Sequence, residues 1–443
     1  MNTKRIGRWV IVLFLLAALP GMTAALAQGQ EPPAKQPLPA VTEPGESAAP
    51  ATNVWESEPN NAMGQADVMG VNDVMAGEMN TDGDVDFFKF YIYERGTAIL
   101  IDVDAETLGT DMDPTVTLYN AAGTEVGYDD DSSGTLDPLL YRNLAPGWWY
   151  VKVRDYYSDS GDNYYYDLIV SAPLLISAAA ANLGTGTVAG IPFRAEDILA
   201  WSDLNDGDEK WVMLVDGSDV GFTKNVMSLS RGWGGSAAGD AQPTLVVSFA
   251  ANVTMTDYQG IVRIVKPWDW MLFNLDQAGS DTSISYRYMD WGANAGLTTA
   301  AEKVDALAFD DQWATVASYF RYISTVGTAS VPRSGGGVLS VPDEDVFRLE
   351  HHGATAWNNT ALFDGSRVVG LAAEDVYAMS YYAPYNDMYL TILGTGRIAR
   401  NPVNQKDIFR IDLPGHTWGG LVWRGPDHGW NYNIDAFDYP GGW

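Results

Sequence analysis

The stretch VDGSDVGF at residues 215–222 recurs further along the chain. Its copies are MDWGANAGL at 289–297, FDGSRVVGL at 363–371 and, more weakly, VWRGPDHGW at 422–430. The leading aspartates of the first three copies, Asp216, Asp290 and Asp364, follow one another at steps of 74 residues. Self-similarity at a fixed period indicates a domain built from repeated supersecondary units. We therefore interpret residues 172–443 as one four-repeat domain.

The quoted stretch could be a turn or a ligand loop for a metal ion. A metal loop should keep an oxygen ligand at the position of Asp219, but the copies place Ala293 or Asn294 and then Arg367 there. An arginine would repel a cation. The leading Asp and the closing Gly persist, which favours a hairpin in which Asp caps its own backbone and Gly takes a positive φ.

Three further landmarks accompany the copies and predict about four strands per repeat. One precedes each copy: EDILAW (196–201), WDWMLF (268–273), EDVFRL (344–349) and KDIFRI (406–411). Another follows each copy: NVMSL (225–229), VDALAF (304–309), VYAMS (376–380) and IDAFDY (434–439). The last landmark is LVVSFAAN (245–252), VASYFRYIS (316–324) and MYLTILGTG (388–396). It is missing after the fourth copy, but residues 173–186 supply such a segment ahead of the first. Pairing of the two chain ends would close a ring and remove exposed sheet edges. We predict a four-bladed β-propeller, with β-sandwich or trefoil-like modules as the alternative.

Residues 53–171 carry short alternating segments divided by Gly, Asp and Asn. The segments are FFKFYIY (87–93), AILIDVDA (98–105), PTVTLYN (114–120), WWYVKV (148–153) and YYYDLIV (164–170). Their period of two and their aromatic and β-branched content predict strands. We expect a jelly-roll-like β-sandwich here, so the whole chain is predicted to be all-β.

Acidic and amide side chains gather just before the first of these strands. They lie in WESEPNNAMGQAD (55–67) and NTDGDVDFFKF (80–90). Asp82, Asp84 and Asp86 occupy alternate positions as a strand begins, which directs them to one side. The pattern favours a bound cation, and a solvated acidic loop is the alternative.

Several ordered motifs in residues 55–170 resemble the bacterial pre-peptidase C-terminal domain. They are Glu56-Ser57-Glu58-Pro59-Asn60-Asn61, Gly83-Asp84-Val85-Asp86-Phe87-Phe88, Asp113-Pro114, Asp129-Asp130-Asp131 and Pro146-Gly147-Trp148-Trp149-Tyr150. The family is similar to the collagen-binding domains of clostridial collagenases. The resemblance implies a β-sandwich with calcium bound by Glu56, Glu58, Asn60 and Asn61, completed by Asp82, Asp84 or Asp86. Such domains usually follow a secreted peptidase, and none precedes this one, so protease activity and collagen binding do not transfer.

Composition restricts the location and the partners of the chain. Residues 1–27 have basic residues, an apolar run and an Ala-Leu-Ala site, which is typical of a secretory signal peptide. Residues 28–52 are a Pro-rich linker. No later segment is apolar enough to span a membrane, so we expect a secreted protein.

The 443 residues carry a net charge of −31 and no cysteine. Nucleic acid is therefore an unfavourable partner, and oxygen-bound calcium suits the chain.

No protease or hydrolase motif is present: His-Glu-x-x-His and Gly-x-Ser-x-Gly are both missing from the sequence. Trp233, Trp291 and Trp430 lie in or beside glycine-rich loops, where exposed indoles would suit sugar rings or protein side chains. Aromatic packing inside the sheets is the alternative.

We expect a secreted, calcium-stabilised, non-catalytic protein that binds an extracellular polysaccharide or protein. A secreted glycan hydrolase using carboxylates of the repeat domain and a structural cell-surface protein stay open.

Overall fold

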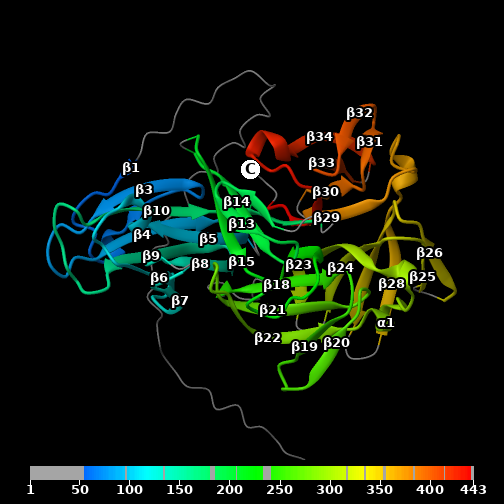
Figure 1. The fold of residues 1–443 in the computed structure, drawn as a ribbon, viewed down its shortest axis with the longest axis horizontal. Helices are drawn as coiled ribbons and strands as arrows, with labels where there is room; N and C mark the ends of the chain where they lie inside the picture. Colours follow the sequence, from blue (N-terminus) through cyan, green and yellow to red (C-terminus); the bar gives the residue numbers. More distant parts are fainter. Residues whose placement is uncertain are drawn as a thin grey trace, which may run out of the picture. The chain divides into compact units, whose positions relative to one another are not determined.

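The computed structural model describes residues 54–443, except 95–96, 133–134, 180–184, 206, 233–240, 316–317, 334–335, 353–355, 383–384, 414 and 441–443. The predicted signal peptide and the Pro-rich linker therefore lie outside the described residues. The described part is all-β, as predicted (Figure 1). Its short helices are η1 (Met63–Gln65), η2 (Glu106–Leu108), α1 (Gly292–Ala295), η3 (Ala300–Glu302), η4 (Gly365–Arg367) and η5 (Gly425–His428). None of the described helices is long and apolar enough to cross a membrane.

Two sheets form a sandwich in the N-terminal half, drawn in blue to cyan in Figure 1. The first has the order β1 (Val54–Trp55), β3 (Asp73–Glu78), β10 (Tyr165–Ser171), β5 (Thr97–Asp104), β8 (Leu139–Leu144) and β17 (Ala241–Gln242). The second has the order β2 (Asp67–Val68), β4 (Asp86–Ile92), β9 (Gly147–Asp155), β6 (Pro114–Asn120) and β7 (Glu125–Asp129). The five strands predicted from the sequence are confirmed as β4, β5, β6, β9 and β10.

Alternation along each strand builds the core between these two sheets. In β4 the side chains of Phe88, Phe90 and Ile92 are buried, while Phe87 and Lys89 between them are half-buried. Successive side chains of a strand point to opposite faces, so one face of β4 enters the core and the other faces outward. The core also receives residues from both sheets, among them Trp149 of β9 and Leu168 of β10.

The outer face of the first sheet packs against the repeat half. Ala98, Leu100, Leu139 and Tyr141 belong to one hydrophobic cluster with residues of the repeat strands. Strand β17, which comes from the repeat half, pairs antiparallel with β8 and extends the sandwich sheet. The boundary predicted at 171/172 falls between β10 and β11, and apolar packing continues across it.

The repeat half contains four sheets of four antiparallel strands each. Their orders are β35 (Ile434–Asp438), β11 (Leu174–Ala178), β14 (Ile198–Asp203), β15 (Glu209–Val215); β16 (Val226–Arg231), β18 (Thr244–Phe249), β21 (Trp270–Gln277), β22 (Ser283–Asp290); β23 (Val304–Thr315), β24 (Ser318–Thr325), β27 (Val346–His352), β28 (Ala356–Phe363); and β29 (Val376–Tyr382), β30 (Asp387–Ile392), β33 (Asp407–Asp412), β34 (Thr417–Arg424). Each sheet therefore uses the four landmarks in the same spatial order.

A two-stranded hairpin interrupts each repeat between its second and third sheet positions. The hairpins are β12 (Gly186–Val188) with β13 (Ile191–Phe193), β19 (Val253–Thr256) with β20 (Val262–Val265), β25 (Ala329–Pro332) with β26 (Val338–Val341), and β31 (Thr395–Ile398) with β32 (Asn401–Asn404). The four hairpins therefore stand at the same point of the strand order.

The two ends of the repeat half meet in one sheet. Strand β11 pairs antiparallel with β35, placing Leu175 opposite Asp438 and Ile176 opposite Phe437. This is the pairing of chain ends that the missing landmark predicted. Strands β16, β23, β29 and β35 lie at one edge of their sheets, and we call them the inner strands. Each contacts the inner strands of the neighbouring sheets, β16 with β23, β23 with β29, β29 with β35 and β35 with β16.

The copies of VDGSDVGF are turns, but the prediction that they close hairpins is wrong: β15 and β16, which flank the first copy, pair with other strands and belong to different sheets. The Asp216 carboxylate accepts hydrogen bonds from the backbone N–H and the hydroxyl of Ser218, at 2.9 and 2.6 Å. The four closing glycines have positive φ: Gly221 (83°), Gly296 (97°), Gly370 (91°) and Gly429 (75°). That region favours glycine because other residues place a Cβ too close to the backbone.

Candidate metal centre

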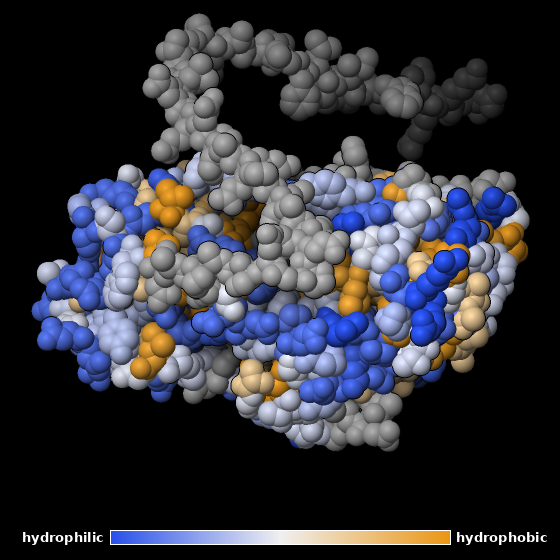
Figure 2. Space-filling view, turned by 90° about the horizontal axis from the view of Figure 1, so that it is seen from above, coloured by the Kyte–Doolittle hydropathy of each residue, from blue (hydrophilic) through white to orange (hydrophobic). Residues whose placement is uncertain are grey.

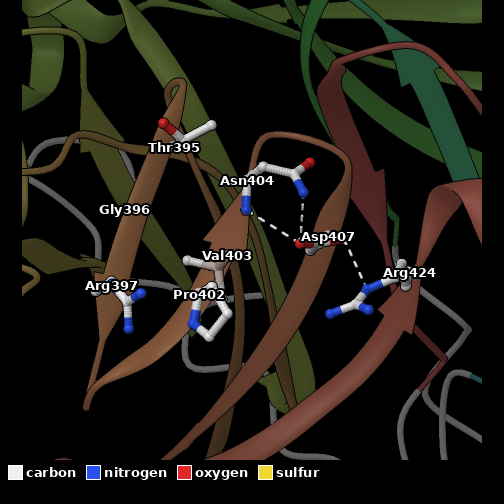
Figure 3. Close-up of a pocket in the computed structure, with 8 residues that line it drawn as sticks. All are labelled: Thr395, Gly396, Arg397, Pro402, Val403, Asn404, Asp407 and Arg424. Atoms are coloured by element: carbon white, nitrogen blue, oxygen red, sulfur yellow. Dashed lines mark hydrogen bonds and ion pairs between the residues drawn. The ribbon is translucent and has the colours of Figure 1, made fainter.

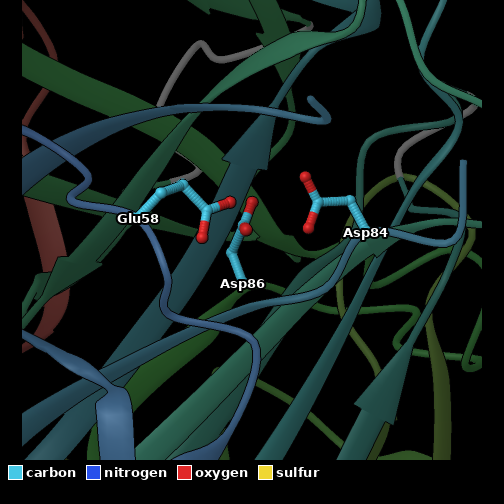
Figure 4. A group of neighbouring side chains, drawn as sticks. All are labelled: Glu58, Asp84 and Asp86. Carbon is cyan, nitrogen blue, oxygen red and sulfur yellow. The ribbon is translucent and has the colours of Figure 1, made fainter. Parts of the chain in front are cut away.

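Three carboxylates converge at the start of β4. One ligand oxygen each from Glu58, Asp84 and Asp86 lies within 4.8 Å of the others, and among the described residues this is the one such group of three. Figure 4 shows the three carboxylates facing one another, with that of Asp86 in the middle. Glu58 is exposed, whereas Asp84 and Asp86 are buried. The strand fixes Asp86, and the turn before it fixes Asp84.

Backbone and amide donors orient Asp84. Its Oδ2 accepts a hydrogen bond of 2.8 Å from the Asn80 N–H, and its Oδ1 accepts one of 3.0 Å from the Val85 N–H. The side-chain amide of Asn61 donates to the same Oδ1 at 2.7 Å. These three donors fix the orientation of the Asp84 carboxylate.

Asn60 lies at the centre of the preceding segment and is fully buried. Its side-chain amide donates to Glu56 Oε2 at 3.1 Å, and its backbone N–H donates to Glu58 Oε2 at 2.9 Å. The Glu78 N–H donates to the other oxygen of Glu56 at 2.7 Å. The Asn60 carbonyl Oδ1 has no hydrogen-bond partner among the described residues, and neither has Asp86 Oδ1. A buried acceptor without a hydrogen-bond partner lowers the stability of the folded state, and a bound ligand at these two oxygens would remove that cost.

Burial and like charge act on the acids of this cluster. Burial, followed by the negative charge of Glu56, raises the pKa of Asp86 to about 9, although the Tyr166 hydroxyl donates a 2.6 Å hydrogen bond to Asp86 Oδ2. Burial is also the main cause that raises the pKa of Glu56, and the charge of Glu58 adds to it. Carboxylates packed this closely repel one another unless protons or a cation neutralise them.

The donor set fits a hard divalent cation. Calcium takes six to eight oxygen ligands from carboxylates, amide and backbone carbonyls and water. The structure brings Glu56, Glu58, Asn60, Asn61, Asp84 and Asp86 together, as the sequence predicts for six of the seven candidates. Asp82 is different: it is exposed and accepts a 2.8 Å hydrogen bond from the Ser160 hydroxyl. The choice left open between the three aspartates is therefore narrowed to Asp84 and Asp86.

Tyr166 is the contributor that sequence reasoning missed. It lies on β10, opposite Gly77 of β3, and its ring fills the space over that glycine, so that a Cβ there would lie 2.4 Å from Tyr166 Cζ. The missing side chain at Gly77 lets the hydroxyl reach Asp86. Only the pairing of β3 with β10 could have indicated this contact.

The tryptophans predicted to bind a ligand differ in how far they are buried. Trp430 is fully buried, and its ring stacks on Phe193 and Trp211 with centroids 5.1 and 5.5 Å apart. The expectation that Trp430 is exposed is wrong, because the glycine-rich loop around it folds the ring inward. Trp291 is half-buried and packs against the cluster shared by the sandwich and the repeat half. Trp233 lies outside the described residues.

Exposed apolar side chains gather instead on the β19–β20 hairpin. Ile261, Val262 and Ile264 are exposed there. Tyr258 and Tyr288, 52% and 40% exposed, lie beside them with ring centroids 6.2 Å apart and planes tilted by 35°. The face drawn in Figure 2 is largely hydrophilic, with hydrophobic residues in small separate patches. The hairpin thus offers an aromatic and aliphatic surface on a strongly acidic protein.

A pocket of about 490 Å³ opens beside the β31–β32 hairpin (Figure 3). Arg397 and Arg424 line it together with Asp407, whose carboxylate accepts hydrogen bonds from the Asn404 backbone and side chain at 3.0 and 2.9 Å. Arg424 approaches the other oxygen of Asp407 at 3.7 Å. Asp407 therefore fixes the hairpin through one oxygen, while its Oδ1 has no hydrogen-bond partner among the described residues.

Comparison with known proteins gives a loose structural similarity over part of the chain. No protein-family model matches the chain, and no curated protein matches it. Among solved structures, the pre-peptidase C-terminal domain of collagenase from Bacillus anthracis is similar to part of the chain. It is 22% identical, the match covers 24% of this chain and 94% of that domain, and the TM-score is 0.21.

Proposed function

We propose that the chain is a secreted, calcium-stabilised protein that binds an extracellular polysaccharide or protein without catalysis. The observation that carries the calcium part is the pair of orphaned buried oxygens, Asn60 Oδ1 and Asp86 Oδ1, inside a cluster of carboxylates. A cation would satisfy both oxygens and remove the repulsion between Glu58, Asp84 and Asp86. Residues 1–27 supply the argument for export, since they have the layout of a signal peptide.

The repeat half, in this proposal, is a four-bladed β-propeller. Four equivalent four-stranded sheets, contacts between successive inner strands and the β11–β35 pairing support it. Propellers present the loops and hairpins of their blades as binding surfaces on a rigid frame. The role of the sandwich is then to anchor and stabilise this frame through the core that the two halves share.

The binding surface we propose is the β19–β20 hairpin, in place of the buried Trp430. Tyr258 and Tyr288 offer two ring faces, and the Gln259 side chain donates to the Tyr258 hydroxyl at 3.0 Å. Aromatic rings bordered by hydrogen-bonding groups suit the apolar faces and hydroxyls of sugars. A neutral polysaccharide fits best, because the net charge of −31 disfavours acidic polymers.

Depletion of the purified chain from solution by insoluble polysaccharides, peptidoglycan and collagen tests the proposed function. We expect binding to a neutral polysaccharide with no soluble product, and loss of binding in the Tyr258→Ala, Tyr288→Ala double variant. Tyr157→Ala is the matched control, since Tyr157 is also an exposed tyrosine but lies in the sandwich half. Released sugar would favour the hydrolase alternative. Unchanged binding in the double variant would overturn the surface assignment.

Calcium binding needs a separate test. The Glu58→Gln, Asp86→Asn variant should lose the rise in thermal midpoint that millimolar calcium gives the parent chain, because a ligand stabilises only the state that binds it. Extracellular calcium modules bind at about 10⁻⁴–10⁻³ M, which sets the concentrations to use. An equal calcium effect in parent and variant would remove this site from the proposal.

A further inference from the structure

Each inner strand of the repeat half begins with a β-bulge at the same position. The register shifts between Val226 and Ser228, between Val304 and Ala306, between Val376 and Ala378, and between Ile434 and Ala436. The bulged residues are therefore Met227, Asp305, Tyr377 and Asp435. A bulge re-aims its side chain away from the regular pleat, and bulges are over-represented near functional sites. Asp305, Tyr377 and Asp435 are polar. Three of the four inner strands, which contact one another, therefore carry a polar side chain at the bulge.

These side chains meet in one buried cluster. The Tyr377 hydroxyl and the Asn225 amide both donate hydrogen bonds to the Asp435 carboxylate. The carboxylates of Asp305 and Asp375 lie against each other, and Asp375 immediately precedes β29. Asp305 and Asp435 have no exposed surface at all. The three acids come from three repeats that are far apart in the sequence, and Asn225, which directly precedes β16, comes from the fourth.

Four carboxylate oxygens in this cluster have no hydrogen-bond partner among the described residues. They are Asp305 Oδ1, Asp305 Oδ2, Asp375 Oδ1 and Asp435 Oδ1. The backbone N–H groups of Asp305 and Ala306 offset part of the burial penalty, but neither reaches hydrogen-bonding geometry with the Asp305 carboxylate. No ion pair joins the three acids to a basic side chain in the part of the chain that is described.

Burial is the main cause that raises the pKa of all three acids. The pKa of Asp305 lies well above its usual range, with the charge of Asp375 as the next cause. The pKa of Asp375 rises to about 7, where the charge of Asp343 adds to burial, and that of Asp435 to about 6. Unpaired buried carboxylates are strongly unfavourable, so neutral pH requires bound protons or a bound cation.

We propose that a divalent, oxygen-preferring cation binds where the inner strands meet, with Asp305 and Asp375 as direct ligands. The orphaned oxygens of Asp305 supply what such an ion coordinates. Asp435 is fixed by Asn225 and Tyr377 and adds negative charge from the outer shell, because the three acids do not form a group as compact as Glu58, Asp84 and Asp86. This site is independent of the sandwich site and would tie three repeats together.

Equilibrium dialysis of the full chain with radioactive calcium at neutral pH tests the proposal. We expect the Glu58→Gln, Asp86→Asn variant, in which the sandwich site is disabled, to keep one bound calcium per chain. Adding Asp305→Asn should weaken that binding at least tenfold, and adding Asp375→Asn instead should do the same. Asp281→Asn is the matched control, because Asp281 is an exposed aspartate of the same half.

The outcomes separate the two sites. Loss of all calcium in the folded sandwich variant would overturn the inner-strand site and leave the sandwich site standing. Calcium that is lost only with Asp305→Asn would support the inner-strand site and remove the sandwich site. If Asp305→Asn leaves calcium binding unchanged and raises the thermal midpoint equally with and without calcium, a shared proton neutralises the acids, and the cation proposal fails.

Discussion

The carboxylate of Asp197 accepts a 2.8 Å hydrogen bond from the backbone N–H of Gly217, which opens the turn twenty residues further along. The same carboxylate accepts a 2.7 Å bond from the Arg194 N–H through its other oxygen. Two copies repeat the relationship, Asp269 with Gly292 at 2.9 Å and Asp345 with Gly365 at 2.8 Å. In these three copies, the aspartate of the segment that precedes the turn therefore accepts a hydrogen bond from a glycine of the turn and holds the turn in place.

Replacing Asp197 by alanine should destabilise the repeat half. The variant leaves the buried N–H of Gly217 without its acceptor, and an unsatisfied buried group costs about 1–3 kcal/mol. The exposed Arg194 also loses its acceptor, but water can replace it. We expect a loss of roughly 1–3 kcal/mol in the free energy of unfolding, measured by denaturant titration. Asp281→Ala, at an exposed aspartate, should change it by less than about 0.5 kcal/mol. Equal effects of the two substitutions would contradict the structural role of Asp197.

The turn glycine whose N–H donates to Asp197 or to its counterpart Asp269 should tolerate no side chain. A Cβ at Gly292 would lie 1.8 Å from the Trp268 carbonyl oxygen, and one at Gly217 would lie 2.2 Å from that of Glu196. Because backbone has to move in both cases, Gly292→Ala should cost at least about 2 kcal/mol in unfolding free energy. Gly64→Ala is the control, since a Cβ there meets nothing within 4 Å. Similar unfolding midpoints for the two variants would show that Gly292 is not as close to the Trp268 carbonyl as described.

The repeat and its turns could be predicted from one sequence because the copies act as an internal comparison. Arg367 at the position of Asp219 argues against a metal, and the persistence of Gly221, Gly296 and Gly370 argues for positive φ, which the structure confirms. Alternation likewise predicts the sandwich strands. In these cases local chemistry alone decides the backbone conformation.

The sequence-based predictions that were wrong concern residues whose position depends on tertiary packing. Trp430 has a loop-like sequence neighbourhood, yet its ring is stacked between Phe193 and Trp211, which come from distant segments. Asp82 shares the alternate spacing of Asp84 and Asp86, but Asp82 and Asp84 both precede the strand, so the hydrogen bonds of the turn and not the period of two set the direction of their side chains. The apolar face that the sandwich shares with the repeat half is also invisible in the alternation pattern.

Trp430→Ala should therefore be a stability variant and not a binding variant. Removing a fully buried indole that stacks on two rings leaves a large cavity, and such truncations cost about 3–5 kcal/mol. Trp55→Ala, at an indole 62% exposed, should have little effect. Thermal unfolding of both variants is the measurement. A stable Trp430→Ala protein that has lost ligand binding would restore the original expectation for this residue.

The sandwich and the repeat half should unfold together. Leu100 on β5 packs in one cluster with repeat residues such as Leu214, and Asn143 donates a 2.7 Å hydrogen bond to the Thr244 carbonyl. Leu100→Ala should lower the unfolding midpoint of both halves by the same amount, for a loss of about 2–5 kcal/mol. Hydrogen exchange followed by mass spectrometry reports each half separately. Protection lost only in residues 54–171 would show that the halves are energetically independent.

Stability in the absence of calcium should fall as pH rises. The pKa of Asp86 is raised to about 9 in the folded chain from an unfolded value near 4. Between these values the folded state binds more protons than the unfolded state, so the free energy of unfolding decreases with pH, by at most about 1.4 kcal/mol per pH unit for one group. Saturating calcium should flatten this contribution, because the cation replaces the proton.

Asp86→Asn isolates the contribution of this carboxyl, since other buried acids such as Asp129, whose pKa burial raises to about 6, add a similar slope in parent and variant. In chelator, the variant should lose less stability than the parent between pH 5 and pH 9, roughly the window set by the two pKa values. It should also gain less from calcium. The measurement is the denaturant midpoint across that pH range, with and without calcium. Parallel curves for parent and variant under both conditions would mean that Asp86 keeps an ordinary pKa, and that the cluster at the start of β4 is a solvated acidic loop.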